Sequence, residues 1–235
     1  MKLKLACPAI LCLALVASPA WAQNWSYDNG PINGTTDAWA INYGYIVGDS
    51  FLAGGTSVTS FNFGVWEFPG DTMTSVQWSI TAAPLGVPPN ALGSSVIYGS
   101  GTASGANLTD TFISTNQYGY NMDKITVSGL NVATTSGTTY WLNLQNASIP
   151  SQDPVYWDEN SGAGCTGTGC PSTAWTNSVG SVASEAFTVS GNDGCRLGDR
   201  GGCTGGPGST PEPSSVMLFG SGILGLAGVL RHKLF

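Results

Sequence analysis

Short segments in which apolar and polar residues alternate recur along the middle of the chain. The clearest two lie at 76–81 and 140–145, where every second residue is apolar. A period of two residues is typical of β-strands that bury one face. Aromatic and β-branched residues predict further strands at 39–47, 58–68, 96–102, 108–115, 123–130 and 185–190.

These segments, with no helical candidate between them, predict an all-β fold. Eight or nine strands favour an antiparallel β-sandwich, jelly-roll-like in topology, over residues 23–190. The late strand follows a long loop-rich segment, as expected for a Greek-key return to a sheet edge. An up-and-down barrel is the alternative.

The segment around Gly64 breaks the alternation. The apolar side switches between Val65 and Trp66. This switch predicts either a β-bulge near Gly64 or a strand that is buried on both faces.

The N-terminal 22 residues have the pattern of a secretory signal peptide. Lys2 and Lys4 precede an apolar run at 5–17, and small residues flank Trp21 before a predicted cleavage site that would leave Gln23 as the mature N-terminus. The pattern predicts export by the Sec machinery and removal of the peptide by signal peptidase.

The C-terminal end predicts a single transmembrane helix. A Gly-rich linker at 191–209 leads to a run of 17 uncharged residues at 214–230, about 26 Å long as a helix. The basic cluster that follows should remain cytoplasmic, which places the preceding domain outside the membrane.

The order of features in this tail resembles a known sorting signal. Pro211, Glu212 and Pro213, then the apolar helix, then the terminal cluster with Arg231, are similar to a PEP-CTERM sorting domain. The resemblance implies an exosortase substrate in the inner membrane of a Gram-negative bacterium, later released to the cell surface or extracellular exopolysaccharide matrix. It covers residues 210–235 and assigns no activity to the middle domain.

Charge makes some binding partners improbable. Residues 23–210 contain 13 acids and three cations, and the whole chain has a formal net charge of −7. Such a surface repels phosphate backbones, which argues against nucleic-acid binding.

The four cysteines that remain after signal cleavage predict disulfides. Export to an oxidising compartment favours pairing, and Gly-rich loops favour Cys165 with Cys170 and Cys195 with Cys203. A zinc site at these cysteines is disfavoured because no histidine supports it.

The residue inventory argues against most enzymes. The only histidine, His232, lies in the sorting tail, which removes Ser-His-Asp and Cys-His catalysis from the domain. The catalytic arrangement that remains is a pair of carboxyl groups, as glycosidases use. The candidate members of such a pair are Glu67, Asp158, Glu159 and Glu185. We therefore expect no enzymatic activity, with a secreted carboxylate-dependent glycoside hydrolase as the alternative.

Two binding functions are compatible with the composition. The mature chain has seven Trp and eight Tyr, and polar neighbours select Trp141, Tyr156 and Trp157 as candidate contacts to glycan. Calcium is the one candidate cofactor, and its candidate ligands in the two acidic loops are Asp28, Asp37, Asp153, Asp158 and Glu159. The sequence thus predicts an adhesive or structural surface module with possible exopolysaccharide binding.

Overall fold

The computed structural model describes residues 24–86, 95–160 and 164–194. Within these ranges no helix has the length and apolarity needed to cross a membrane. The predicted signal peptide, most of the predicted linker and the predicted transmembrane helix lie outside the described residues.

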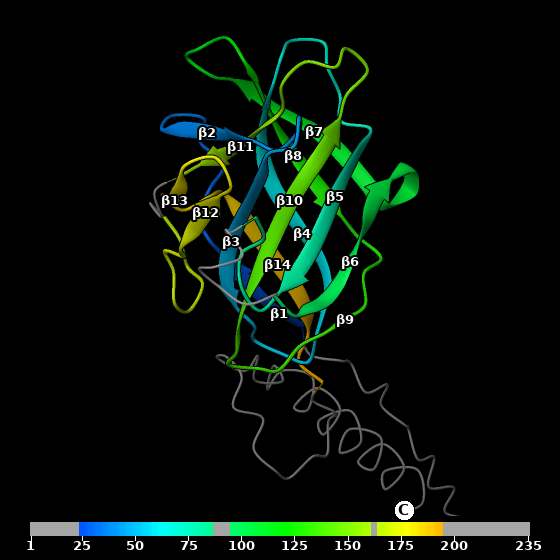
Figure 1. Cartoon of the computed structure of the whole chain (residues 1–235), viewed down its shortest axis with the longest axis vertical. Helices are drawn as coiled ribbons and strands as arrows, with labels where there is room; N and C mark the ends of the chain where they lie inside the picture. The colour runs from blue at the N-terminus through cyan, green and yellow to red at the C-terminus, as the bar shows by residue number, and fades with distance from the viewer. Residues whose placement is uncertain (1–23, 87–94, 161–163, 195–235) are drawn as a thin grey trace, which may run out of the picture.

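The described chain forms two antiparallel sheets (Figure 1). The eight-stranded sheet contains β1 (Asn24–Asp28), β14 (Phe187–Asn192), β4 (Ser57–Glu67), β11 (Tyr156–Glu159), β2 (Asp37–Ala40), β8 (Asn121–Val127), β7 (Leu108–Thr115) and β9 (Val132–Ala133). The six-stranded sheet contains β13 (Gly180–Val182), β12 (Ala174–Thr176), β3 (Ile46–Leu52), β10 (Thr139–Ser148), β5 (Ser75–Thr81) and β6 (Ile97–Ser104). A short 3₁₀ turn, η1 (Gly105–Asn107), joins β6 to β7.

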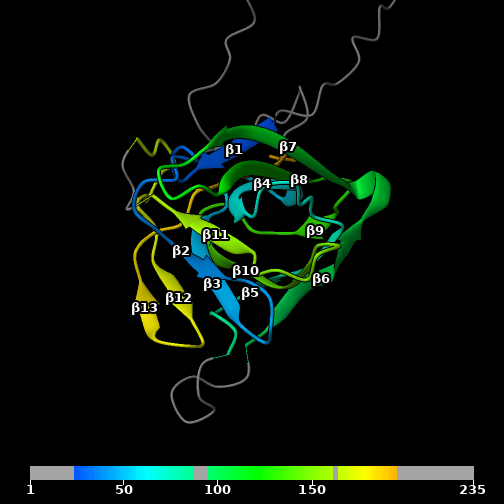
Figure 2. The same ribbon diagram turned by 90° about the horizontal axis from the view of Figure 1, so that it is seen from above.

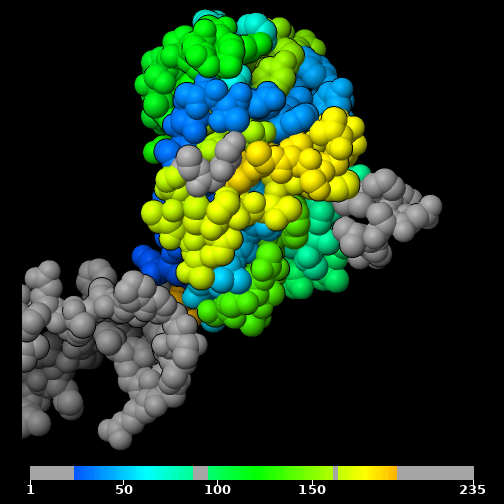
Figure 3. All heavy atoms as spheres, turned by 90° about the vertical axis from the view of Figure 1, so that its left-hand side faces the viewer, coloured from blue at the N-terminus to red at the C-terminus, as the bar shows by residue number. Residues whose placement is uncertain are grey.

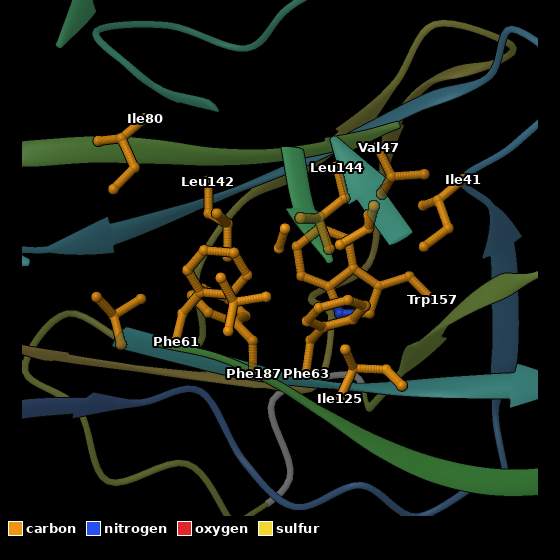
Figure 4. Packing of buried hydrophobic residues seen from close by; sticks show 14 of the residues in the cluster. Ile41, Val47, Phe61, Phe63, Ile80, Ile125, Leu142, Leu144, Trp157 and Phe187 are labelled. Carbon is orange, nitrogen blue, oxygen red and sulfur yellow. The ribbon is translucent and has the colours of Figure 1, made fainter. Parts of the chain in front are cut away.

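The two sheets pack face to face around one apolar core (Figures 2 and 4). Phe61, Phe63 and Phe187 project from the eight-stranded sheet toward Leu142 and Leu144 of the six-stranded sheet. The alternation predicted for 76–81 and 140–145 is confirmed in β5 and β10, whose apolar residues face this core. The all-β prediction is therefore confirmed. Burial of the apolar and aromatic side chains in this core is the main contribution to the stability of the domain.

The strand order differs from that of an up-and-down barrel. In such a barrel, consecutive strands are neighbours and the first and last strands close the ring, whereas here β3 pairs with β10 and β4 pairs with β8 and β14. Strand β1 also pairs with β14. The N- and C-terminal strands of the described domain therefore lie side by side in the eight-stranded sheet.

Strand β4 is the central strand of the eight-stranded sheet and is buried on both faces over its second half. Its pairing with β8 runs without a register shift past Gly64. The predicted bulge is thus wrong, and the two-face burial predicted as its alternative is confirmed. Gly64 is needed because an added Cβ would lie 2.6 Å from the Ile32 side chain, which covers this outer face.

The segment predicted as one strand at 39–47 is two strands. Tyr43 and Gly44 have φ values of 55° and 85°, and the turn they form separates β2 from β3. Strand β2 belongs to the eight-stranded sheet and β3 to the six-stranded sheet. The aromatic residues of 39–47 therefore looked like one strand although the chain passes from one sheet to the other. At the other end, β14 continues to Asn192, two residues past the predicted domain boundary at 190.

Segments from the two ends of the domain meet on one face. The backbone N–H groups of Thr166 and Gly167 donate to the Asp28 carbonyl at 3.1 and 2.8 Å. Figure 3 shows this face, where the later loop (yellow) lies against the early segment (blue). These contacts fix the loop that contains the first predicted disulfide.

Candidate functional site

Strand β6 lies beside β9 at one side of the sandwich (Figure 2). A hollow of about 320 Å³ opens between the two sheets on this side. One wall is β6, the edge strand of the six-stranded sheet. The facing wall is the segment 127–132, which joins β8 to β9, together with Asn107 of η1. The hollow is open to solvent along an edge that no further strand covers among the described residues.

Small residues on the inward face of β6 create this hollow. Register pairs Gly99 with Ile80, Gly101 with Trp78 and Ala103 with Val76. Ala103 is buried in the core, and an added Cβ at Gly99 would lie 2.6 Å from the Val132 side chain. An added Cβ at Gly101 would lie 3.3 Å from the Trp78 indole. Gly101 is therefore the position of β6 at which the lack of a side chain bears on the Trp78 indole.

Trp78 forms the aromatic floor of the hollow. Its indole packs edge-on against Phe61 with ring centroids 6.1 Å apart, and it remains half-buried. The packing holds the ring in place without covering it. A fixed, partly exposed indole is the kind of surface on which a sugar ring stacks.

Polar groups surround this floor. Asn107, Ser128 and Asn131 are exposed and line the hollow, and Tyr98 stands at its rim in edge contact with Tyr140. No charged side chain lines it. Amides and hydroxyls beside an aromatic ring suit a ligand with many neutral hydroxyl groups.

The glycan contacts predicted from sequence do not lie in this hollow. Trp157 is fully buried and donates its indole N–H to the Ala186 carbonyl at 3.1 Å, so its prediction as a glycan contact is wrong. Trp141 and Tyr156 are half-buried on strands of different sheets and are not brought together. Sequence reasoning selected aromatics with polar neighbours and therefore missed Trp78, which belongs to an apolar face.

The acids predicted to bind calcium are also separated. Asp28 and Asp37 accept from the nearby backbone N–H groups of Gly30 and Ala38, as in local turns. Asp153 lies at a second, shallow hollow of about 220 Å³ beside Tyr43, whose hydroxyl donates to the Gln152 carbonyl. These three acids have no common site in the structure.

Asp158 and Glu159 are held by protein donors. Both Asp158 oxygens accept from backbone N–H groups at 33–34, and Oδ1 also accepts from the Trp66 indole at 2.6 Å. Glu159 accepts from the Trp39 indole at 3.0 Å. These contacts join the segment after β1 to β11, which is a structural role.

Two further carboxyl groups lie in the interior next to this network. The backbone N–H of Glu185 donates to Asp49 Oδ2 at 2.7 Å, and Asn29 donates to the same oxygen at 3.2 Å. Burial raises the pKa of Asp49 to about 7. Burial also raises the pKa of Glu185 well above its ordinary value, with the Asp49 charge adding to the rise.

A separate acidic group lies at the end of β4. Glu67 is fully buried, and both of its carboxyl oxygens lack a hydrogen-bond partner. Burial raises its pKa to about 8, and the charges of Asp110, Asp123 and Asp71 add to the effect. As the side chains stand, no group of three or more His, Cys, Asp or Glu in the described ranges is arranged to hold a metal ion.

The first predicted disulfide is present. Cys165 and Cys170 are bonded, and the Cys170 side chain packs against the core. Cys195 and Cys203 lie outside the described residues. The bridge closes a loop, as predicted.

Comparison with known proteins addresses the C-terminal tail. Residues 209–231 match the family model described as the PEP-CTERM protein-sorting motif. The chain carries a PEP-CTERM sorting motif. The match includes Pro211, Glu212, Pro213 and Arg231, so the predicted sorting signal is confirmed, and it supports export and sorting to the cell surface by an exosortase. No curated protein and no solved structure matches the chain.

Proposed function

We propose that this PEP-CTERM protein is a non-enzymatic adhesive module that binds neutral glycan chains of the extracellular matrix in the hollow between β6 and β9. The half-exposed indole of Trp78, which lies against Gly101 and lines the hollow, carries the proposal. A sugar ring stacked on the indole would place its hydroxyls near the side chains of Asn107 and Asn131.

Charge supports a neutral ligand. The described residues contain 12 Asp and Glu but only one cationic side chain, Lys124. A polysaccharide rich in uronic acid or sulfate would be repelled by this surface. The neutral lining of the hollow offers no compensating cation.

The positions of the candidate catalytic acids support binding over hydrolysis. Glu67, Asp158, Glu159 and Glu185 are all buried, and none lines the hollow with Trp78. A glycosidase needs two carboxyl groups on opposite sides of a bound sugar linkage. The buried acids do not offer such a pair to a ligand in the hollow.

Strand pairing supports a jelly-roll sandwich as the topology of the module. The pairs β1–β14, β3–β10, β4–β8 and β5–β6 are nested, as in a long hairpin wrapped into two facing sheets. We propose the same route to the matrix for the whole chain: Sec export, signal-peptide removal, transient insertion in the inner membrane and release by exosortase.

The test is binding of the full-length exported chain to an array of neutral and acidic polysaccharides. We expect binding to neutral glycans, and Trp78→Ala should weaken it by 10-fold or more, about the 1–3 kcal/mol expected for loss of one stacking aromatic. Trp141→Ala, an outward tryptophan on the same sheet, is the matched control and should bind as the unmodified chain does.

A second variant fills the hollow instead of removing its floor. Gly101→Val places a side chain against the Trp78 indole and should abolish binding, while Thr109→Val on the other exposed edge strand should not. Equal binding by the Trp78 and Trp141 variants, or preferential binding of acidic glycans, would contradict the proposal.

A further inference from the structure

The second hollow of the domain lies at the end of the sandwich where β10 passes to β11. It has a volume of about 220 Å³ and is lined by Asn42 and Tyr43 of the turn before β3, by the end of β10, and by Gln152 and Asp153 before β11. It shares no lining residue with the hollow at Trp78. The two hollows are therefore separate sites.

This end of the domain faces away from the sorting tail. Asn192, from which the chain continues toward the motif at 209–231, pairs with Ser57 at the start of β4. Tyr156, which follows the hollow, pairs with Trp66 near the other end of β4. Strand β4 has 11 residues and spans roughly 35 Å. Figure 1 shows the same separation between the turn after β10 and the end of β14.

The backbone around the hollow has an uncommon conformation. Tyr43, Asn146 and Gln152 have φ values of 55°, 49° and 64° and are the non-glycine residues with positive φ in the described ranges. All three line this hollow. A left-handed backbone is unfavourable for a residue with a Cβ and persists only where surrounding contacts hold it. The hydroxyl of Tyr43, which donates to the Gln152 carbonyl, makes one such contact across the hollow.

The amide groups of the hollow present acceptors. Asn42 is 6% exposed, and its Nδ2 donates to the Asp153 carbonyl at 3.0 Å. Because a carbonyl can only accept, this bond fixes the orientation of the amide, and its buried Oδ1 receives no donor from the described residues. Asn146 likewise turns its Nδ2 to Gln77 Oε1 at 2.8 Å. The hollow therefore suits a ligand that donates hydrogen bonds.

Asp153 supplies the charge of the hollow. It is half-buried and is the one acidic or basic residue of the lining. In the part of the chain that the structure describes, its carboxylate accepts no hydrogen bond and forms no ion pair. The described residues contain 12 Asp and Glu against the single cation Lys124, so the surrounding field is negative. This hollow favours a cation, whereas the lining at Trp78 is neutral.

Aromatic rings add a second attraction for a cation. The Tyr43 side chain is 62% exposed and stands at the hollow with its hydroxyl held by the bond described above. The Ile41 N–H donates to the Val155 carbonyl at 2.9 Å, which places Tyr156 next to this turn. Tyr156 in turn packs edge-on against Tyr120, with ring centroids 5.9 Å apart. An ammonium group over a tyrosine ring is attracted by the negative face of the ring.

We propose that this hollow binds a protonated amino group of an amino-sugar polymer. The ammonium donates to the Asp153 carboxylate and to the amide oxygens and lies beside the Tyr43 ring. Ser148 and Gln152 offer a hydroxyl and an amide to the hydroxyls of the same sugar. A lysine side chain would instead bring an apolar stem to this polar rim, which favours a glycan over a basic peptide. The site and its charged ligand go beyond the proposed binding of neutral glycans.

The experiment compares two glucosamine oligomers of equal length, one with free amino groups and one fully N-acetylated. Binding to the full-length exported chain is measured by calorimetry at pH 5.5, where the free amines carry charge. We expect the free-amine oligomer to bind about 10-fold more tightly, from the carboxylate and the aromatic ring together. Raising the salt concentration from about 0.05 M to about 0.5 M should remove most of this preference, because salt screens the attraction between exposed charges.

Substitutions locate the preference in the hollow. Asp153→Asn should abolish it, whereas Asp37→Asn, at an exposed acid that lines neither hollow, should retain it. Tyr43→Asn removes the ring and should reduce the preference, and asparagine tolerates the positive φ of this position. Phe112→Ala, at an exposed aromatic residue on β7, is the control for loss of a ring.

Trp78→Ala separates this inference from the proposed function. It should weaken binding of the N-acetylated oligomer and leave the preference for the free-amine oligomer in place, so each site has its own readout. Equal affinity of the unmodified chain for the two oligomers would overturn the inference. So would an unchanged preference in the Asp153 variant, or tighter binding of an oligolysine of the same charge.

Discussion

Asp49 and Glu185 are two carboxyl groups that the fold buries side by side. Folding brings the Asp49 carboxylate to the Glu185 backbone N–H and leaves the Glu185 carboxyl oxygens without donors. Water would solvate both groups in the unfolded chain. The raised pKa values of these groups therefore mean that the folded protein keeps protons that the unfolded chain releases.

This difference predicts that stability falls as pH rises. The ordinary pKa is 3.8 for Asp and 4.5 for Glu, while the folded pKa values of Asp49, Glu67 and Asp123 are about 7, 8 and 6. Their stabilising effect is complete below about pH 4 and is lost as pH rises through the folded values. Tm should therefore fall between pH 4.5 and pH 8 in calorimetric scans.

Single substitutions assign this pH dependence to the buried groups. Glu185→Gln should flatten the decline, because an amide does not ionise in the interior. Asp153→Asn changes a half-buried carboxyl before β11 whose charge does not act on Glu185, and it serves as the control. A Tm that rises from pH 4.5 to pH 8, or the same decline in the Glu185 variant, would show that these buried carboxyl groups do not control stability.

At the scale of the element, alternation predicts the long strands well. Strands β5 and β10 each present one face to the core, so their period of two survives in the sequence. The short strands β11, β12 and β13 were not predicted, because three or four residues show too little pattern. Strands β11 and β12 pair with the longer strands β4 and β3, and β13 pairs with β12.

The candidate site shows why function is harder to predict than strands. Trp78 follows the apolar pattern of β5 and looks in sequence like an ordinary core residue. Its exposure depends on Gly101, which becomes its neighbour only through the pairing of β5 with β6. Small residues at every second position of a strand were the available signal, and they have meaning only once a partner strand is known.

The loop with the disulfide gives an element-scale prediction. The Cys165–Cys170 bridge closes a loop of six residues that is tied to Asp28. Replacing both cysteines by serine should lower the free energy of unfolding by about 2 kcal/mol, which is roughly 4–8 °C in Tm. Thermal unfolding by circular dichroism measures this change.

The second pair of cysteines provides the control. Replacing Cys195 and Cys203 by serine also removes two cysteines, but from the Gly-rich segment that follows β14. We expect this variant to unfold within about 2 °C of the unmodified domain. If it lost as much Tm as the first variant, the linker would be part of the stabilising structure.

At the scale of the molecule, the topology depends on contacts between distant residues. Strand β1 pairs with β14 across more than 150 residues, and no local pattern specifies that partner. The sorting signal, in contrast, is local in the sequence. The Pro211–Pro213 triplet, an apolar run and a basic residue follow one another within residues 209–231. This contrast explains why the sequence predicts the route of the protein more fully than its strand order.

The sorting motif predicts a specific product. Until the tail is removed, its run of 17 uncharged residues should hold the chain in the bilayer, because burial of its apolar side chains makes dissociation unfavourable. Mass spectrometry of protein released from the cell surface should therefore find Gln23 at the start and no residue beyond the neighbourhood of Pro211–Pro213. Replacing Pro211 and Pro213 by alanine should leave Phe235 on the chain and keep it in the membrane fraction, whereas Pro207→Ala in the linker should be processed normally. Released protein that retains Phe235 would show that cleavage at this motif is not the step that frees the domain.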